Sequence, residues 1–319
     1  MTNWSEIILH SDESKTVWDS IFSNLLEITK QSHSPVKLHN ETLAPDRLLA
    51  ESAWQLWYDY EQNAQRTSQA LIEWWNGQSA GINKAVLILD ALSLRELSII
   101  LACAHSKNIE PSSVTVTGSE VPSDTDQFAQ AIGSSSRSAI RNKAKNESLK
   151  LNGPVYTDVM SHPFEDCIGS IPAVNDLLIW HTWLDDLIHV HKRLPDQIYK
   201  TASENLQSDG FWEFINRLRQ GRKLIITSDH GYAVSKLFST TLGDSVSEIM
   251  KATFGASRCI TYNANWDHKL MPPTVLNHNG HLVVMGQTKW KVQGGFPQVC
   301  HGGLSLLEVA VPFIELPPV

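Results

Sequence analysis

The stretch Leu224-Ile225-Ile226-Thr227-Ser228-Asp229-His230-Gly231 decides the fold that we predict for this chain. An apolar run of this length is typical of a buried strand, and glycine allows a sharp turn where the strand ends. Asp229 and His230 therefore follow the carboxyl end of a strand, where ligands bind in open α/β sheets. Together they offer a carboxylate oxygen and an imidazole nitrogen to a metal ion. A strand that ends in an ordinary polar turn has the same pattern, so the rest of the chain must separate the two interpretations.

Composition and charge narrow the classes of protein to be considered. A chain of 319 residues is long enough for one large or two modest domains with a substantial core. The formal net charge of −8 argues against a broadly basic surface that coats nucleic acid, but it leaves room for a local basic groove. We expect no membrane-spanning segment and no secretory signal. The scattered cysteines, without a Cys-x-x-Cys pair, predict reduced thiols in a cytoplasmic protein.

Residues 1 to about 80 are predicted to form a helical region, because apolar residues recur there at helical spacing without strand-like alternation. This region holds six of the eleven tryptophans, namely Trp4, Trp18, Trp54, Trp57, Trp74 and Trp75. Tryptophan side chains most often pack in cores or at interfaces. We therefore expect core packing or a docking face for a protein partner in preference to a platform for stacked bases.

Two further segments place chemically useful side chains after predicted strands. The apolar run 85–89 ends in Asp90 and is followed by a predicted helix, which is a common opening of an α/β fold. The predicted strand 113–117 leads to a helix whose beginning holds Ser123 and Thr125. Backbone N–H groups at such a position favour phosphate, although a capping hydroxyl explains the same residues.

A third predicted strand, 176–183, leads into a segment rich in acidic residues and histidines. If this segment is helical, Asp185 and His189 lie one turn apart on the same face and can share one metal ion. Acidic residues are also favoured at a helix start for electrostatic reasons. Spacing alone leaves Asp186 and His191 as alternative ligands.

The remaining segments complete the predicted arrangement. Residues 240–291 are predicted to be irregular and to form a lid or insertion, and a strand is expected at 281–286. The chain closes with a loop that holds His301, then a short helix and a final strand. The stretch 133–150 is the most basic part of the chain, and it contains Arg137 and Arg141. It is a solvated segment by default, and a clamp on a substrate backbone is the alternative.

Parallel strands would bring these side chains to one edge of the sheet. Two carboxylate and imidazole sites would each hold a divalent cation there, with the hydroxyl of Thr125 or Ser123 between them. Such a pair of cations can stabilise the attacking and the leaving oxygens of an in-line phosphoryl displacement.

These motifs resemble the PglZ domain family, a branch of the alkaline phosphatase superfamily. The matching segments are Leu89-Asp90-Ala91-Leu92 with Glu96, Val121-Pro122-Ser123-Asp124-Thr125, Thr227-Ser228-Asp229-His230-Gly231, Gly286 with Lys289-Trp290-Lys291, and 301–312. The last segment is close to the family pattern H-G-G-L-S-x-x-E-x-x-V-P. The resemblance covers roughly residues 81–319 and leaves the helical region uncovered. Ser93 departs from the pattern, because the family often has arginine after D-A-L.

The resemblance implies an alkaline-phosphatase-like three-layer α/β sandwich with a mostly parallel central sheet in residues 81–319, beside the helical region 1–80. It also implies two divalent metal ions, for which the mixture of histidines and carboxylates suits zinc, or else manganese. One ion would be held by Asp90, Thr125, Asp229 and His230, and the other by Asp185, His189 and His301. Thr125 would be the nucleophile, and the substrate side would include Ser123, Arg137 and Arg141.

Members of this family are similar to components of bacterial anti-phage defence systems, and some relatives resemble nucleotide or oligonucleotide phosphodiesterases. We therefore expect a cytoplasmic, metal-dependent phosphodiesterase that acts on nucleic acid or a nucleotide. One alternative is a catalytically quiet scaffold of a defence complex, with the tryptophan-rich region as its docking surface. Another is a phosphomonoesterase, since the same core serves both reactions.

Overall fold

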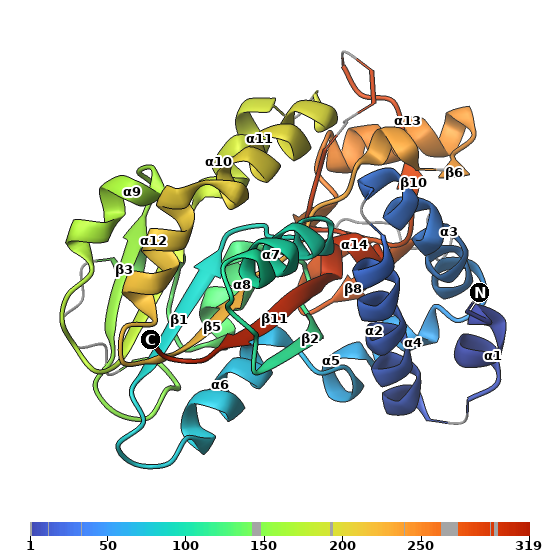
Figure 1. Ribbon diagram of the computed structural model, residues 1–319. Helices are drawn as coiled ribbons and strands as arrows, with labels where there is room; N and C mark the ends of the chain where they lie inside the picture. The colour runs from blue at the N-terminus through green and yellow to red at the C-terminus, as the bar shows by residue number, and fades with distance from the viewer. Residues whose placement is uncertain are drawn as a thin grey trace.

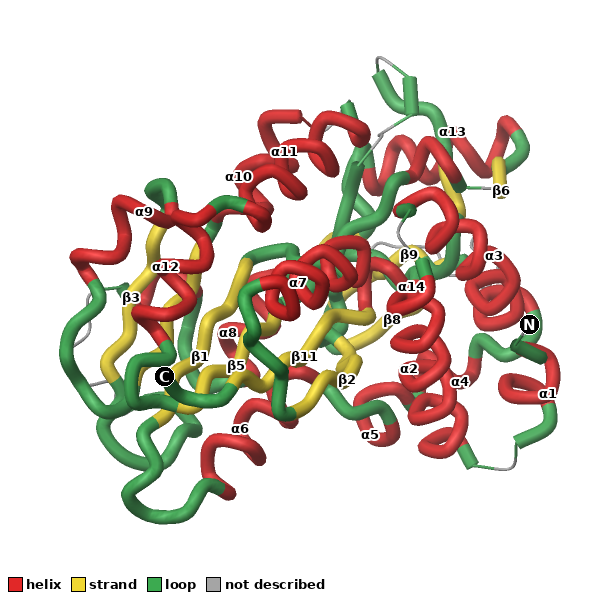
Figure 2. The backbone as a smooth tube through the Cα atoms, in the orientation of Figure 1, coloured by secondary structure: helices red, strands yellow, loops and turns green. Residues whose placement is uncertain are grey.

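The centre of the molecule is a six-stranded sheet with the strand order β2-β11-β5-β1-β4-β3 (Figures 1 and 2). The computed structural model describes residues 2–11, 13–32, 34–141, 148–191, 194–238, 240–262, 274–293, 295–296 and 299–319. The strands of the sheet are β1 (Lys84–Leu89), β2 (Ser113–Gly118), β3 (Tyr156–Met160), β4 (Leu177–His181), β5 (Lys223–Thr227) and β11 (Ala310–Leu316). Strands β1, β3, β4 and β5 run parallel, whereas β11 is antiparallel to its neighbours β2 and β5. The prediction of a mostly parallel central sheet is confirmed.

Helices account for most of the remaining chain. Before β3 they are α1 (Trp4–Leu9), α2 (Ser14–Gln31), α3 (Pro35–Glu51), α4 (Gln55–Tyr58), α5 (Tyr60–Asn63), α6 (Thr67–Gly77), α7 (Leu94–Ser106), α8 (Thr125–Ala131) and the 3-10 helix η1 (Arg137–Ile140). After β3 they are α9 (Phe164–Cys167), η2 (Ile168–Ser170), α10 (Trp183–His191), α11 (Pro195–Gln207), α12 (Asp209–Leu218), η3 (Ser235–Leu237), α13 (Asp244–Phe254) and α14 (Leu306–Val309). No helix in these described ranges combines the length and the apolar character needed to cross a bilayer.

Helices cover both faces of the sheet and make the predicted three-layer sandwich. Ala85, Leu87 and Leu89 of β1 contribute to a core shared with α2, α7, α11 and α12. The alternate residues Val86 and Ile88 belong to a second core, which is shared with α6 and α8. A strand that is apolar on both faces is typical of a parallel sheet covered on both sides.

Helices α1 to α5 pack beside the β2 edge of the sheet, and β3 forms the opposite edge (Figure 1). The rings of Trp18 and Trp57 lie 4.8 Å apart, and both contact the ring of Tyr60. Tyr60 also donates a hydrogen bond of 2.9 Å to the carbonyl of Ser119. The helical prediction for this region is confirmed. Trp18, Trp57 and Trp75 are buried in cores, so they cannot stack on nucleic-acid bases.

The structure differs from the sequence prediction in two places. Strand β3 was not predicted, because its short pattern contains Thr157 and Asp158 and gives no continuous apolar run. The segment 240–291 was predicted to be irregular apart from a strand at 281–286. That strand is present as β9 (His281–Val284), but the described parts of the segment also hold α13, β6 (Thr240–Thr241), β7 (Cys259–Thr261), β8 (Val275–His278) and β10 (Thr288–Lys289). Helix α13 and the sheet β7-β9-β8 share a small hydrophobic core, which includes Phe254 and Trp290. Residues 142–147 of the basic stretch and 263–273 of the predicted lid lie outside the described residues.

Candidate metal centre

Six of the predicted ligands converge at the carboxyl ends of neighbouring strands. Asp90 directly follows β1, Asp229 and His230 follow β5, and α10 begins just beyond β4. Because β1 pairs with both β5 and β4, the residues that follow these strands emerge side by side. Their ligand atoms form two groups, each within 4.8 Å, which are Asp90 with Asp229 and His230, and Asp185 with His189 and His301.

The Thr125 hydroxyl lies against the first group. Its Oγ1 atom donates a hydrogen bond of 2.8 Å to Asp229 Oδ2 and lies 3.4 Å from Asp90 Oδ1 and 3.5 Å from His230 Nε2. Thr125 is the first residue of α8, and the side chain of Asp124 caps this helix by accepting from the backbone N–H of Gln127. The structure thus joins Thr125 to the three predicted ligands of one metal ion.

Hydrogen bonds from the surrounding chain orient the first group. Trp180 of β4 donates from its indole Nε1 to Asp90 Oδ2 at 3.0 Å. The backbone N–H of Ala91 donates to Asp229 Oδ1 at 3.1 Å, and Ala91 has a φ of +62°. His230 Nδ1 lies 2.9 Å from the carbonyl of Gly231, which assigns the proton to Nδ1 and leaves Nε2 free to bind a metal. A non-glycine residue in the left-handed region beside the ligands is a common sign of a functional site.

The second group is built around Asp185. His189 Nε2 lies 3.3 Å from Asp185 Oδ2, and His301 Nε2 lies 3.8 Å from Asp185 Oδ1. Within the described part of the chain, Asp185 Oδ1 is buried and has no hydrogen-bond partner. A buried carboxylate oxygen without a partner is costly unless a cation or proton compensates it.

Ser123 forms hydrogen bonds to the loop that carries His301, a member of the second group. Its hydroxyl donates to the carbonyl of Gly303 at 2.8 Å and accepts from the backbone N–H of Gly302 at 3.1 Å. These bonds hold the loop that carries His301. Ser123 is fully buried and does not line the cavity beside Thr125, so its hydroxyl is occupied by the protein.

The two ligand groups place several ionisable side chains close together in the buried interior. Burial raises the pKa of Asp90 well above its usual value, and the charge of Asp229 raises it further. Burial is likewise the main cause of a raised pKa at Asp185. Burial alone would lower the pKa of His230, but the charges of Asp229 and Asp90 outweigh it and leave the pKa raised. Burial and the neighbouring His230 lower the pKa of His301 to about 3. Carboxylates clustered with imidazoles form a donor set that fits divalent transition metals.

Arg137 and Arg141, which follow α8 in the chain, occupy different positions. Arg137 contacts the carboxylate of Asp90, and it lines a cavity of about 360 Å³ together with Thr125 and His301. Arg141 is exposed and is not among the residues that line this cavity.

The structure also separates the alternative ligands and adds a residue that the sequence analysis missed. Asp186 accepts a hydrogen bond from the Thr182 hydroxyl, and neither Asp186 nor His191 belongs to a ligand group. Trp180 was missed as a partner of Asp90. The available signal was a tryptophan near the end of an otherwise aliphatic strand, since a buried indole N–H usually needs an acceptor.

No family model and no curated protein matches the sequence. The fold is similar to the crystal structure of phosphonoacetate hydrolase from Sinorhizobium meliloti 1021 in complex with phosphonoformate, with a TM-score of 0.45 and 14% identity over 75% of this chain and 90% of that chain. It is also similar to murine ectonucleotide pyrophosphatase/phosphodiesterase 5, with a TM-score of 0.42 and 14% identity over 74% of this chain and 88% of that chain. An inactive form of the murine protein in complex with AMP matches with the same values.

Proposed function

We propose that this chain is a metal-dependent phosphoester hydrolase of the alkaline phosphatase superfamily, with two divalent cations, zinc or manganese, and with Thr125 as nucleophile. The observation that carries the proposal is the position of the Thr125 hydroxyl. It lies 2.8 Å from Asp229 in the first ligand group and shares its cavity with His301 of the second group. A hydroxyl between two such groups suits in-line attack on a phosphorus atom.

Each ligand group in this proposal holds one cation. Asp90, Asp229, His230 and Thr125 form the first set, and the buried, unpartnered oxygen of Asp185 makes the second set suitable for a cation. When bound, the two cations would supply positive charge to the attacking and the leaving oxygens. The mixture of carboxylates and imidazoles favours zinc or manganese over magnesium.

The chain's own residues then carry out the displacement. Thr125 Oγ1 forms a bond to phosphorus as the bond to the leaving oxygen breaks, and Asp229 Oδ2 is in position to take the hydroxyl proton. The product is a phosphothreonine ester at Thr125. Attack by water on this ester releases phosphate or a phosphomonoester and restores the hydroxyl.

Arg137 is the residue that we assign to the substrate phosphate. Its guanidinium contacts Asp90 and lines the cavity beside Thr125. With a cation bound at Asp90, the guanidinium would be available to the phosphate oxygens, which it can bind in bidentate geometry. Arg141 is exposed further along the chain, and we assign it to a neighbouring phosphate of a longer substrate.

The preferred substrate in this proposal is a phosphodiester of a nucleic acid or nucleotide. The sequence after Arg137 is rich in basic residues, and this composition supports a polyanionic substrate. Membership of the PglZ family and a role in anti-phage defence belong to the same proposal. They rest on sequence motifs such as His301-Gly302-Gly303-Leu304-Ser305.

Hydrolysis of bis(p-nitrophenyl) phosphate and p-nitrophenyl phosphate tests the proposal. Wild type, Thr125→Ala and Thr125→Ser are assayed with zinc, manganese and magnesium, and the bound metal is measured in each sample. We expect metal-dependent turnover of the diester that is lost in Thr125→Ala and partly kept in Thr125→Ser. Faster turnover of the monoester would assign a phosphatase. Full activity of Thr125→Ala would overturn the mechanism, and stoichiometric metal without any turnover would favour the scaffold.

A further inference from the structure

A second, larger cavity borders α10 on a different side from the metal centre. Its volume is about 770 Å³, which is within the range of small-molecule binding pockets. The chain after β3, α9, α10, α11 and the start of α12 surround it. It includes no residue of the two ligand groups. Nothing in the proposed hydrolysis uses this cavity.

Aromatic and aliphatic side chains form the apolar part of the cavity. Phe164 is buried there, and its ring lies 4.4 Å from the ring of His181 and 5.3 Å from that of Trp183. Leu187 and Val190 of α10 continue this surface, and 74% of Val190 is exposed. An exposed valine beside a half-buried indole provides an apolar wall for a ligand.

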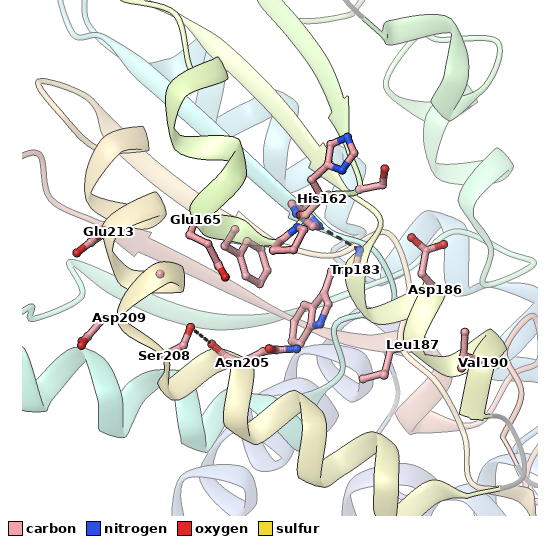
Figure 3. A pocket seen from close by; sticks show the side chains of 15 residues that line it. His162, Glu165, Trp183, Asp186, Leu187, Val190, Asn205, Ser208, Asp209 and Glu213 are labelled. Atoms are coloured by element: carbon pink, nitrogen blue, oxygen red, sulfur yellow. Dashed lines mark hydrogen bonds between the residues drawn. The ribbon is translucent and has the colours of Figure 1, made fainter.

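Acidic side chains surround the same cavity. Glu165, Asp209 and Glu213 lie on one side of Trp183, and Asp186 lies on the other (Figure 3). No lysine or arginine is among the described lining residues. Lys107 pairs with Asp209 at 2.9 Å, but within the described ranges no cationic side chain pairs with the other three carboxylates. The cavity therefore combines an apolar wall with a surplus of negative charge.

We propose that this cavity binds an organic cation that has an apolar body. The ammonium or guanidinium group would lie beside the carboxylates of Glu165 and Glu213, on one side of Trp183. The apolar body would lie against Phe164 and Trp183, whose ring faces also attract cations. A free amine and a lysine or arginine side chain of a short peptide have this same chemistry.

The position of α10 gives this site a physical connection to the metal centre. Asp185 and His189 belong to the second ligand group, whereas Asp186 and Val190, their neighbours in the helix, line the cavity. A ligand in the cavity therefore contacts the helix that holds two of the second group's ligands. Binding itself requires neither metal nor hydrolysis, so its test is independent of the proposed function.

Titration calorimetry on the full-length protein tests the proposal, with 2-phenylethylammonium as the probe. Its neutral and anionic analogues, 2-phenylethanol and phenylacetate, are titrated in parallel. We expect saturable binding of the ammonium probe, and binding of both analogues that is weaker by about tenfold. Equal binding of 2-phenylethanol, or no saturable binding of the probe, would overturn the proposal.

Variants locate the site and identify the source of the cation. Glu165→Gln and Glu213→Gln should each raise the Kd by about threefold, as expected for exposed charge pairs, whereas Glu248→Gln on α13 should leave it unchanged. Equal affinities in all three variants would contradict this location. A blocked Lys-Phe-Lys peptide that binds more tightly than the free amine would identify a peptide ligand, and weaker binding would identify a small molecule. Either result supports the shared chemistry.

Discussion

The imidazole rings of His230 and His301 stack with their centroids 4.4 Å apart and their planes inclined by 17°. His230 belongs to the group that contacts Thr125, and His301 belongs to the group around Asp185. The stack therefore joins the two ligand groups into one centre. Burial lowers the pKa of His301 to about 3, so this ring stays neutral beside its partner at physiological pH.

The first prediction separates His189 from His191, which spacing alone could not distinguish. His189 Nε2 lies 3.3 Å from Asp185 Oδ2, whereas His191 ends α10 outside both ligand groups. His189→Ala should lose one of two bound metal equivalents, because the second group keeps only two ligands. His191→Ala is the matched control and should keep both equivalents. Metal content measured after dialysis checks this, and the reverse pattern would reassign the ligand.

The second prediction concerns the indole that supports Asp90. Trp180→Phe removes the donor to Asp90 Oδ2 but keeps an aromatic ring for packing against Phe128. Loss of such an outer hydrogen bond should weaken metal affinity by about 10- to 100-fold. Trp212→Phe is the matched control, because that buried indole donates to the carbonyl of Leu206.

Competition titrations with a metal chelator measure this affinity, and thermal unfolding compares the stability of the two variants. Similar losses of stability with a loss of affinity only in Trp180→Phe would confirm the role of the indole. Unchanged affinity in Trp180→Phe would show that Asp90 needs no support from it.

The third prediction tests the two arginines. Arg137→Ala should lower kcat/KM for bis(p-nitrophenyl) phosphate by about 100-fold, a loss typical of one charge-stabilising donor. Arg137→Lys should recover only part of this activity, because lysine keeps the charge without the bidentate geometry. Arg141→Ala should change the small substrate little and affect only longer oligonucleotides, since Arg141 is exposed outside the cavity. Equal effects of both alanine variants on the small substrate would contradict these positions.

The fourth prediction concerns Asp46 of α3, which accepts hydrogen bonds from the backbone N–H of Leu306 and from Gln287 Nε2. Burial raises the pKa of Asp46 to about 7. An unfolded aspartate has a pKa near 3.9, so between these values the folded state holds a proton that the unfolded state has released. This contribution to stability is complete below about pH 4 and is lost as the pH rises toward 7, by up to about 1.4 kcal/mol per pH unit.

Asp46→Asn removes this titration and should gain stability relative to wild type as the pH rises from 4 to 7. The new amide can donate to Gln287 Oε1, which is buried and has no hydrogen-bond partner among the described residues. Urea unfolding at pH 5, 6, 7 and 8 measures the difference. Asp19→Asn, at an exposed site on α2, is the control for an aspartate-to-asparagine change. Parallel curves for wild type and Asp46→Asn would refute the raised pKa.

The sequence by itself determined every strand of the central sheet except β3, and the kinds of ligand that follow these strands. The apolar runs that became β1 and β5 end just before Asp90 and the Ser228-Asp229 pair. They can be recognised because strand patterns and their ends are local properties of the chain. The i, i+4 spacing of Asp185 and His189 is local for the same reason. Residues after parallel strands meet at one edge, so the approximate location of the centre could also be predicted.

Only the tertiary structure decided which of these side chains meet. The strand order places β1 between β5 and β4, and this order brings Trp180 to Asp90. Contacts between distant segments also place Arg137 in the cavity that Thr125 lines and leave Arg141 outside it. The hydroxyl of Ser123 is hydrogen-bonded to the backbone of residues 302–303. These contacts depend on how distant segments pack against one another. The packing free energy that selects them is shared by many residues, so no local pattern encodes it.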